Sequence, residues 1–482
     1  MLFDRVKSLD QILETAEKKG LKRQLGWFEL MMLGIGAIIG TGIFVLTSVA
    51  ANKAGPGMMY SFIIAGSVCA LTALIYAEIA SMVPVSGSAY TYSYAVLGEL
   101  IAWMVGWALI LEYAIAAGAV AVGWSGYANG FLREIGMGLP IALTAGPADT
   151  ITLPDGTTAS GGFNLIACIV SLLVTWLLVV GTSKSAKFTA VLVIVKIIAL
   201  AVFVVIALPT VSSANFEPML PNGWGTPLSG VGVLGAAASI FFAYVGFDAV
   251  STAAEETKNP NRNIPIGLIG SLAVCTVFYL LVAYSAVGSV GAQPGGPLSQ
   301  SKEPLAFVLR QLGHPQIGNW VGIAAIVALP SVVLMMIFGQ TRILFTMARD
   351  GLMPKAFAKV HPRFHTPYVV TIVTGIVVSL FAAMFPVDVL ADISNAGTLF
   401  AFLIVAVGVM MLRIREPNRA RPFKTPLVWI VGPLAVAGCA LLFVSLGWNP
   451  TIKFFLYWTA AGLVIYYAFA RRSSALGQEQ SK

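Results

Sequence analysis

The sequence predicts an all-α membrane protein with twelve transmembrane helices. Of its 482 residues, 58% are hydrophobic and only 10% are charged, whereas an average soluble domain is about 25% charged. The mean hydropathy is +0.86, and a soluble fold of this length could not bury so much apolar surface. Apolar runs of roughly 20 residues recur along the chain, and each is long enough to cross a hydrocarbon core about 30 Å thick.

Twelve apolar runs are predicted to be helices. Their expected ranges are 28–50, 59–83, 97–128, 163–181, 186–208, 229–254, 264–288, 317–347, 368–384, 389–411, 427–446 and 452–470. The third and eighth are longer than a span requires, so we expect them to be tilted or to extend beyond the membrane. The Gly-, Pro- and Thr-rich stretch 139–162 is predicted to be an external loop.

The basic residues predict the orientation of the chain. Most of the 29 Lys and Arg residues lie in the two terminal tails and in connections on the same predicted side of the membrane. Such a bias places both termini in the cytoplasm of a multi-pass protein of the cell membrane. It also explains the net charge of +8 without a surface for nucleic acid. The four cysteines lie in apolar runs and the three histidines in loops, so no metal site or other cofactor is predicted.

The segment GIGAIIGTGIF at residues 34–44 carries four glycines inside the first apolar run, although glycine weakens a helix. Two interpretations are open. Gly36 and Gly40 form a small-xxx-small motif, which lets helices pack closely. Alternatively, the helix is broken, and its halves offer free N–H groups to a carboxylate and free carbonyls to a cation. Gly40, Thr41 and Gly42 would then let a small ligand reach the backbone.

A second candidate break lies in the sixth predicted helix. Its segment SIFFAYVGFDAVSTAAEE, residues 239–256, holds Gly246, the acid Asp248 and a small polar run. The first and sixth helices occupy corresponding places if helices 1–5 and 6–10 are inverted repeats, which two blocks of five spans allow. Phe242 directly precedes the proposed break, where it could form a lid over a ligand or simply belong to the core.

Four ionisable residues lie well within predicted spans: Glu78, Glu112, Lys196 and Asp248. Charges inside a membrane are costly, so each is a functional candidate. Lys196 lies about 15 Å from the cytoplasmic end of its helix; it could load and release a proton, or tether two helices permanently. Asp248 could contact substrate, help with the proton or cap a half-helix. Glu112 could bind a cation or a proton, whereas the position of Glu78 favours a gate or a helix–helix contact.

Five motifs resemble the amino acid–polyamine–organocation superfamily. They are GIGAIIGTGIF at 34–44, PVSGSAYTYSYAVLGELIAW at 84–103, FFAYVGFDAVSTAAEE at 241–256, GQTRILFTMARDGLMPK at 339–355 and NAGTLFAF at 395–402. Within that superfamily, the chain is similar to bacterial members of the cationic amino acid transporter family. The resemblance implies a leucine-transporter-type fold, a five-plus-five inverted repeat with helices 1 and 6 unwound. The implied parts are a tail at 1–26, repeats at 27–208 and 229–411, two last helices at 427–470 and a tail at 471–482.

The resemblance also implies where a substrate binds. In such proteins the carboxylate of an amino acid meets the first break, which corresponds here to Ile38, Gly40, Thr41 and Gly42. The amino group meets carbonyls of the second break, which corresponds to Phe242, Ala243 and Val245. Glu112 and Asp248 match acidic positions near the pocket, and Lys196 matches a lysine of proton-coupled relatives. Bacterial members with these motifs accept cationic or small neutral amino acids.

These expectations together predict a secondary active transporter that imports L-amino acids with protons by alternating access. An amino acid exchanger without net proton coupling is the close alternative. A transporter-like sensor is less favoured, because no soluble domain of adequate size is apparent. A channel would require a continuous polar pore, and only four strong charges lie at depth; no cluster of nucleophile, base or metal ligands indicates an enzyme. The expected partners are the amino acid, the proton and the lipid bilayer.

Overall fold

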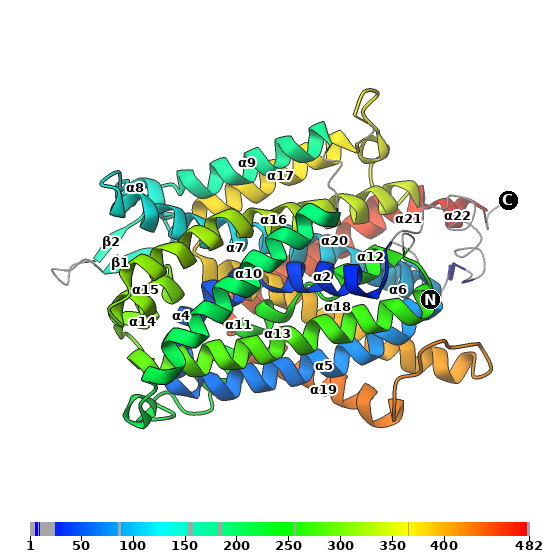
Figure 1. The fold of residues 1–482 in the computed structure, drawn as a ribbon. Coiled ribbons are helices and arrows are strands. Elements are labelled where there is room, and N and C mark those ends of the chain that lie inside the picture. The colour runs from blue at the N-terminus through cyan, green and yellow to red at the C-terminus, as the bar shows by residue number, and fades with distance from the viewer. Residues whose placement is uncertain are drawn as a thin grey trace.

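The computed structural model describes residues 5–7, 9, 25–84, 88–152, 158–181, 186–254, 257–364 and 366–479. Within these ranges the regular secondary structure is helical apart from one short hairpin and one isolated bridge between Leu25 and Thr257. The long helices lie roughly side by side (Figure 1). Described residues near the two ends of the chain meet at one end of the molecule, where Arg5 donates to the carbonyl of Arg471 at 3.0 Å.

Before residue 210, one long helix is mostly buried. That helix is α7, Glu99–Glu134, and its most apolar 18-residue window is 83% buried. The other elements of this half are α2 (Trp27–Ile38), α3 (Thr41–Phe44), α4 (Leu46–Ala54), α5 (Met58–Met82), α6 (Ser88–Val96), α8 (Ile141–Thr144), β1 (Thr150–Thr152), β2 (Thr158–Ser160), α9 (Leu165–Val180) and α10 (Ala186–Ala207).

The second half repeats the pattern of long helices with one that is interrupted. Its elements are α11 (Gly232–Tyr244), α12 (Ala249–Thr252), α13 (Pro260–Val290), α14 (Pro297–Gln300), α15 (Pro304–Gln311), α16 (Pro315–Arg349), α17 (Tyr368–Met384), α18 (Val387–Arg415), α19 (Val428–Ser445), α20 (Lys453–Ile465), α21 (Arg471–Ser473) and α22 (Ala475–Glu479). Helices α16 and α18 both pack along α7.

Apolar outer faces agree with a membrane environment. Among the described residues, eight helical stretches are long and apolar enough to cross a membrane, and α2, α9, α11 and α17 are shorter apolar helices. On α9 the exposed side chains include Leu172, Leu173 and Trp176, and on α17 they include Ile372 and Ile376. These residues lie on one face of each helix. Soluble monomers rarely expose such continuous apolar surface, so these faces suit lipid.

The structure changes three details of the expected spans. The expected helices at 28–50 and 229–254 are each divided, into α2 to α4 and into α11 and α12. The stretch 139–162 was expected to be a plain loop, but it includes α8 and an antiparallel hairpin. Helix α6 lies in a segment that was expected to be a connection. The third and eighth expected helices correspond to α7 and α16, whose lengths of 36 and 35 residues confirm that they are longer than one span requires.

One buried carboxylate joins the two tails. Glu99, at the start of α7, accepts hydrogen bonds from Arg5 at 3.1 Å and from the hydroxyls of Tyr94 and Tyr466 at 3.1 and 3.0 Å. The hydroxyl of Ser474 also donates to it. Because these donors come from the N-terminal tail, α6 and the C-terminal region, Glu99 fixes all three at this end of the molecule.

The opposite end holds a second cluster of charges. Lys53 of α4 forms an ion pair with Asp392 of α18 at 2.6 Å, and its ammonium also lies 2.6 Å from the hydroxyl of Ser239 on α11. The side-chain amide of Asn395 donates to the carbonyls of Ala238 and Ser239 at 2.7 and 3.0 Å. These contacts hold α4, α11 and α18 together.

Candidate functional site

The first helix interruption lies inside the glycine-rich segment. Helix α2 ends at Ile38 and α3 begins at Thr41. Ile39 has φ −71° and ψ 96°, and Gly40 has φ −144° and ψ −147°, so both leave the helical region. The last carbonyls of α2 and the first N–H groups of α3 therefore lack their usual partners within a helix.

The second interruption lies between α11 and α12, two residues later than the sequence suggested. Phe242 and Ala243 still belong to the last turn of α11, and Val245 takes an extended conformation with φ −64° and ψ 141°. Gly246 has φ +117°, and a Cβ added there would lie 2.9 Å from the carbonyl carbon of Ala37. Both the positive φ and the close backbone favour glycine at this position.

The two interruptions touch each other. A Cβ added to Gly42 would lie 2.2 Å from the Cα of Ala243, so only glycine allows this approach. The hydroxyl of Tyr279, on α13, lies 2.8 Å from the carbonyl oxygen of Ile38 and 2.9 Å from that of Ala243. One buried tyrosine therefore bridges the broken ends of α2 and α11.

Lys196 meets the end of α2 rather than an acid. It is 1% exposed, and its ammonium donates to the carbonyl of Gly36 at 2.9 Å. A cation at a helix C-terminus interacts favourably with the helix dipole. A Cβ at Gly36 would lie 2.7 Å from Val193, one turn before Lys196. This glycine thus lets α10 approach closely enough for the contact, and the packing and broken-helix interpretations both apply to the segment.

The two acids lie beside this region on different helices. Asp248 is 2% exposed and accepts a hydrogen bond from the hydroxyl of Tyr113 on α7 at 3.0 Å. It precedes α12, but its side chain makes no capping bond there, which argues against the cap interpretation. Glu112, also on α7, is 1% exposed. Its Oε2 has no hydrogen-bond partner within the part of the chain that is described.

Two other candidates, Thr41 and Glu78, contact neighbouring helices. Thr41 directs its hydroxyl towards the carbonyl of Val120 on α7, at 3.5 Å. Glu78 is held by two 2.7 Å bonds from Arg413, and Arg421 lies 3.3 Å from it. The Glu78 carboxylate therefore joins α5 to the end of α18, which agrees with the helix–helix interpretation.

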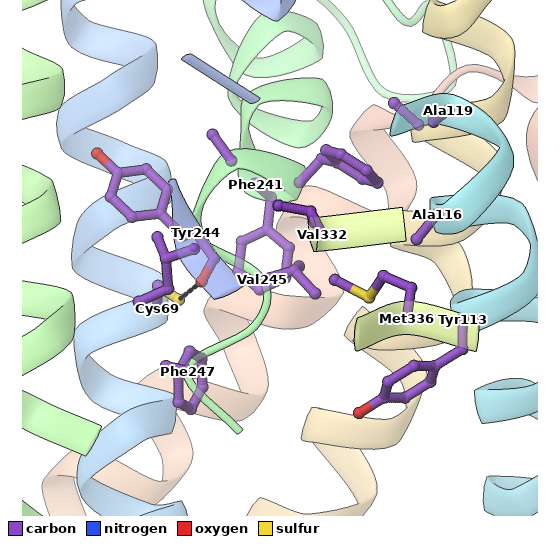
Figure 2. Packing of buried hydrophobic residues seen from close by; sticks show 14 of the residues in the cluster. Cys69, Tyr113, Ala116, Ala119, Phe241, Tyr244, Val245, Phe247, Val332 and Met336 are labelled. Carbon is purple, nitrogen blue, oxygen red and sulfur yellow. Dashed lines mark hydrogen bonds between the residues drawn. The ribbon is translucent and has the colours of Figure 1, made fainter. Parts of the chain in front are cut away.

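Apolar side chains from α7 and α16 face the second interruption. Figure 2 shows Val332 and Met336 of α16 and Ala116 of α7 directed towards the segment that carries Val245. Val332 also reaches the first interruption, because its methyl groups would lie 3.4 Å from a Cβ at Gly40. Sequence reasoning missed Val332, Met336, Tyr113 and Tyr279. A mid-span tyrosine, which needs a hydrogen-bond partner when buried, was the available signal for the last two.

Comparison with known proteins gives the family. The model of a family described as amino acid permease matches residues 25–469. The chain belongs to the amino acid permease family. It is 45% identical to the branched-chain amino acid permease BcaP of Bacillus subtilis, over 98% of this chain and 99% of that protein. It is 41% identical to the methylthioribose transporter of the same organism, over 98% and 99%.

A plant relative supports the branch within the superfamily. Cationic amino acid transporter 9 of Arabidopsis thaliana is 36% identical over 82% of this permease and 67% of its own length. This permease is therefore a bacterial-type relative of the cationic amino acid transporters. The family and these relatives are transporters, so the chain is a multi-pass membrane protein of amino acid transport.

Proposed function

We propose that this permease imports L-amino acids with protons by alternating access around the two interruptions. The contact of the two broken helices through Gly42, Ala243 and Tyr279 supports this proposal most directly. It brings the first N–H groups of α3 and the last carbonyls of α2 and α11 into one buried place. A zwitterion carries the complementary pair of charges.

In this proposal each end of the substrate binds backbone. The carboxylate accepts hydrogen bonds near Gly40, Thr41 and Gly42, where α3 begins. The ammonium donates to carbonyls at the end of α11, from Phe242 to Val245, and near Ile38. The proposed architecture has twelve spans, with helices 1 and 6 unwound. Its inverted repeats lie at 27–208 and 229–411, and both termini are cytoplasmic.

The substrate side chain lies, in this proposal, against apolar residues. Val332, Met336 and Ala116 are directed towards Val245 (Figure 2), so a small or branched aliphatic side chain fits better than a cationic one. The branched-chain permease of Bacillus subtilis is named for such substrates. Asp248, just before α12, and Glu112, on α7, lie beside the interruptions. In this proposal they help to bind a substrate cation or the coupled proton.

Lys196 is the proposed coupling residue. When protonated, its ammonium holds the Gly36 carbonyl at the end of α2. Loss of the proton weakens this charge-assisted bond and allows α2 to move. Proton release would thus be linked to the opening of one side of the site.

The test is uptake into proteoliposomes that contain the purified permease. Labelled leucine, alanine and arginine are compared with and without an inward proton gradient, for the wild type, Lys196→Ala and the surface control Lys453→Ala. We expect the gradient to accelerate uptake of the neutral amino acids in the wild type and the control only. If only amino acid preloaded inside stimulates uptake, the protein is an exchanger and the role of Lys196 is wrong. Uptake of methylthioribose without any amino acid would overturn the substrate class.

A further inference from the structure

A small cavity lies between α5, α6 and α18. Its volume is about 10 Å³, which is roughly the space that the centre of one water molecule needs. Of its nine described lining residues, only Tyr92 and Ser93 carry a polar side chain, and both belong to α6. The cavity is therefore an apolar space with two hydroxyl-bearing residues in its wall.

Both hydroxyls are buried without a hydrogen-bond partner. Tyr92 is 2% exposed and Ser93 is 3% exposed, and neither hydroxyl bonds to another group of the described chain. A buried hydroxyl left unpaired costs free energy, and ordered water commonly supplies the missing partner. A helical serine often donates instead to a carbonyl of the preceding turn, as Ser81 of α5 does to Glu78 at 2.9 Å. Ser93 makes no such bond, so its hydroxyl is available to a ligand.

The cavity lies between the second interruption and the end of the molecule where the two tails meet. The ring of Tyr76, on α5, contacts Phe247 of that interruption with 6.0 Å between centroids, and Tyr92 with 5.7 Å. Beyond the cavity, Arg415 at the end of α18 donates to the last carbonyl of α6 at 2.9 Å. Gly408, which lines the cavity, lies seven residues before Arg415, about 10 Å along the helix. In the orientation proposed above, the cavity is on the cytoplasmic side of the substrate site.

The seam between α6 and α18 around these hydroxyls is aliphatic. Its side chains at the cavity include Val96, Leu97, Val405 and Val409, and each of these is at most 4% exposed. An aliphatic seam resists the entry of water, and hydrophobic constrictions close pores by the same effect. Helix α6 also packs against α12, the half-helix that follows the second interruption. Water that is already bound inside the seam would lower the cost of separating α6 from α18.

We propose that Tyr92 and Ser93 bind a water molecule in this cavity, and that the bound water lets α6 separate from α18 when the site opens to the cytoplasm. The ligand is neutral, because none of the nine described lining residues is charged. The binding half of the proposal needs only the two hydroxyls and the space beside them. The gating half rests on the proposed function, because it requires alternating access.

The first experiment is pulsed X-ray hydroxyl-radical footprinting of the purified full chain in detergent, read by mass spectrometry. The X-ray pulse ionises bound water in place, so a ring beside that water is oxidised although radicals from bulk solvent cannot reach it. The internal control is Tyr127, which is 0% exposed and whose hydroxyl donates to the carbonyl of Phe44 at 2.7 Å. Gly408→Ala adds a methyl group at the cavity, 3.6 Å from Leu97, which is ordinary contact. The matched control is Gly118→Ala in α7, where the nearest atom is also 3.6 Å away.

We expect Tyr92 to be oxidised in the wild type and in Gly118→Ala but not in Gly408→Ala, whereas Tyr127 should stay unmodified in all three. Tyr92→Phe and Ser93→Ala should each lower the melting temperature, because each removes a hydrogen bond to the water. If Tyr92 were as protected as Tyr127 in the wild type, the water site would be overturned. A melting temperature that either hydroxyl variant raises or leaves unchanged would mean that its hydroxyl is dry, which also overturns the site.

The second experiment tests the gating half. Leucine counterflow into proteoliposomes and leucine binding by scintillation proximity are measured for the wild type, Gly408→Ala and Gly118→Ala. We expect Gly408→Ala to bind leucine as well as the other two but to exchange it more slowly. Counterflow at the wild-type rate would overturn the gating half and leave the water site standing. If the wild type itself transports no leucine, the gating half fails together with the proposed function, whereas the footprinting result does not depend on transport.

Discussion

Replacing Gly42 by alanine should separate the two helix interruptions. The added Cβ would lie 2.2 Å from the Cα of Ala243 and 2.4 Å from its Cβ. Carbon atoms in contact are normally about 3.5–4.0 Å apart, so the two backbones must move apart by roughly 1.5 Å. Backbone atoms cannot turn aside as the end of a long side chain can. Overpacking of this kind typically costs about 1–3 kcal/mol, which lowers the population of the touching arrangement roughly fivefold to 150-fold.

Two measurements check this expectation. The melting temperature in detergent should fall, and uptake of labelled leucine into proteoliposomes should drop by a similar factor. The control is Gly118→Ala in the middle of α7, where the nearest atom to the added Cβ is 3.6 Å away. That variant should be neutral or slightly more stable, because alanine is the better helix former. If Gly42→Ala kept the uptake rate and the melting temperature of the wild type, the proposed contact would be refuted.

Four further substitutions, two of them combined in one cycle, test other buried contacts. Lys196→Met keeps the apolar stem but removes the bond to Gly36, so gradient-driven uptake should disappear while substrate binding by scintillation proximity persists; an unchanged gradient response would count against coupling. Tyr279→Phe removes only the hydroxyl shared by two buried carbonyls, and it should lower the stability by about 1–3 kcal/mol; an unaltered melting curve would show that the bridge contributes nothing. Lys53→Met and Asp392→Asn should be less than additive in a double-mutant cycle, with a coupling of about 0.5–3 kcal/mol, whereas strictly additive effects would mean that the ion pair is unimportant.

The sequence predicted the helical membrane class and the two segments that carry the interruptions, because glycines and an acid inside apolar runs are conspicuous. It could not predict which side chains face them. A helix that is apolar all round has no clear inward face, so the rotation of α16, and with it Val332 and Met336, depends on packing against α7. The buried position of Tyr279 likewise follows only from the way α13 packs.

The position of the second break was displaced for a local reason. The apolar run around Phe242 favours continued helix, and the chain leaves the helix only at Val245, just before the glycine that adopts a positive φ. The depth of Lys196 within an apolar run indicated that its ammonium needs a buried partner. The choice between a carbonyl and a carboxylate depends on distances that one sequence does not contain.

The shared carboxylate of Glu99 makes the two tails a single unit for protein engineering. Donors from Arg5 near the start of the chain and from Tyr466 and Ser474 near its end meet at this one acid. Shortening either tail past these residues would remove hydrogen-bond donors from the same buried acid. Because both truncations affect this one site, the loss of expression in a doubly truncated chain should be smaller than the sum of the two single losses. Fusion partners and purification tags therefore belong beyond residue 479, on a flexible linker, and not in place of the last turns.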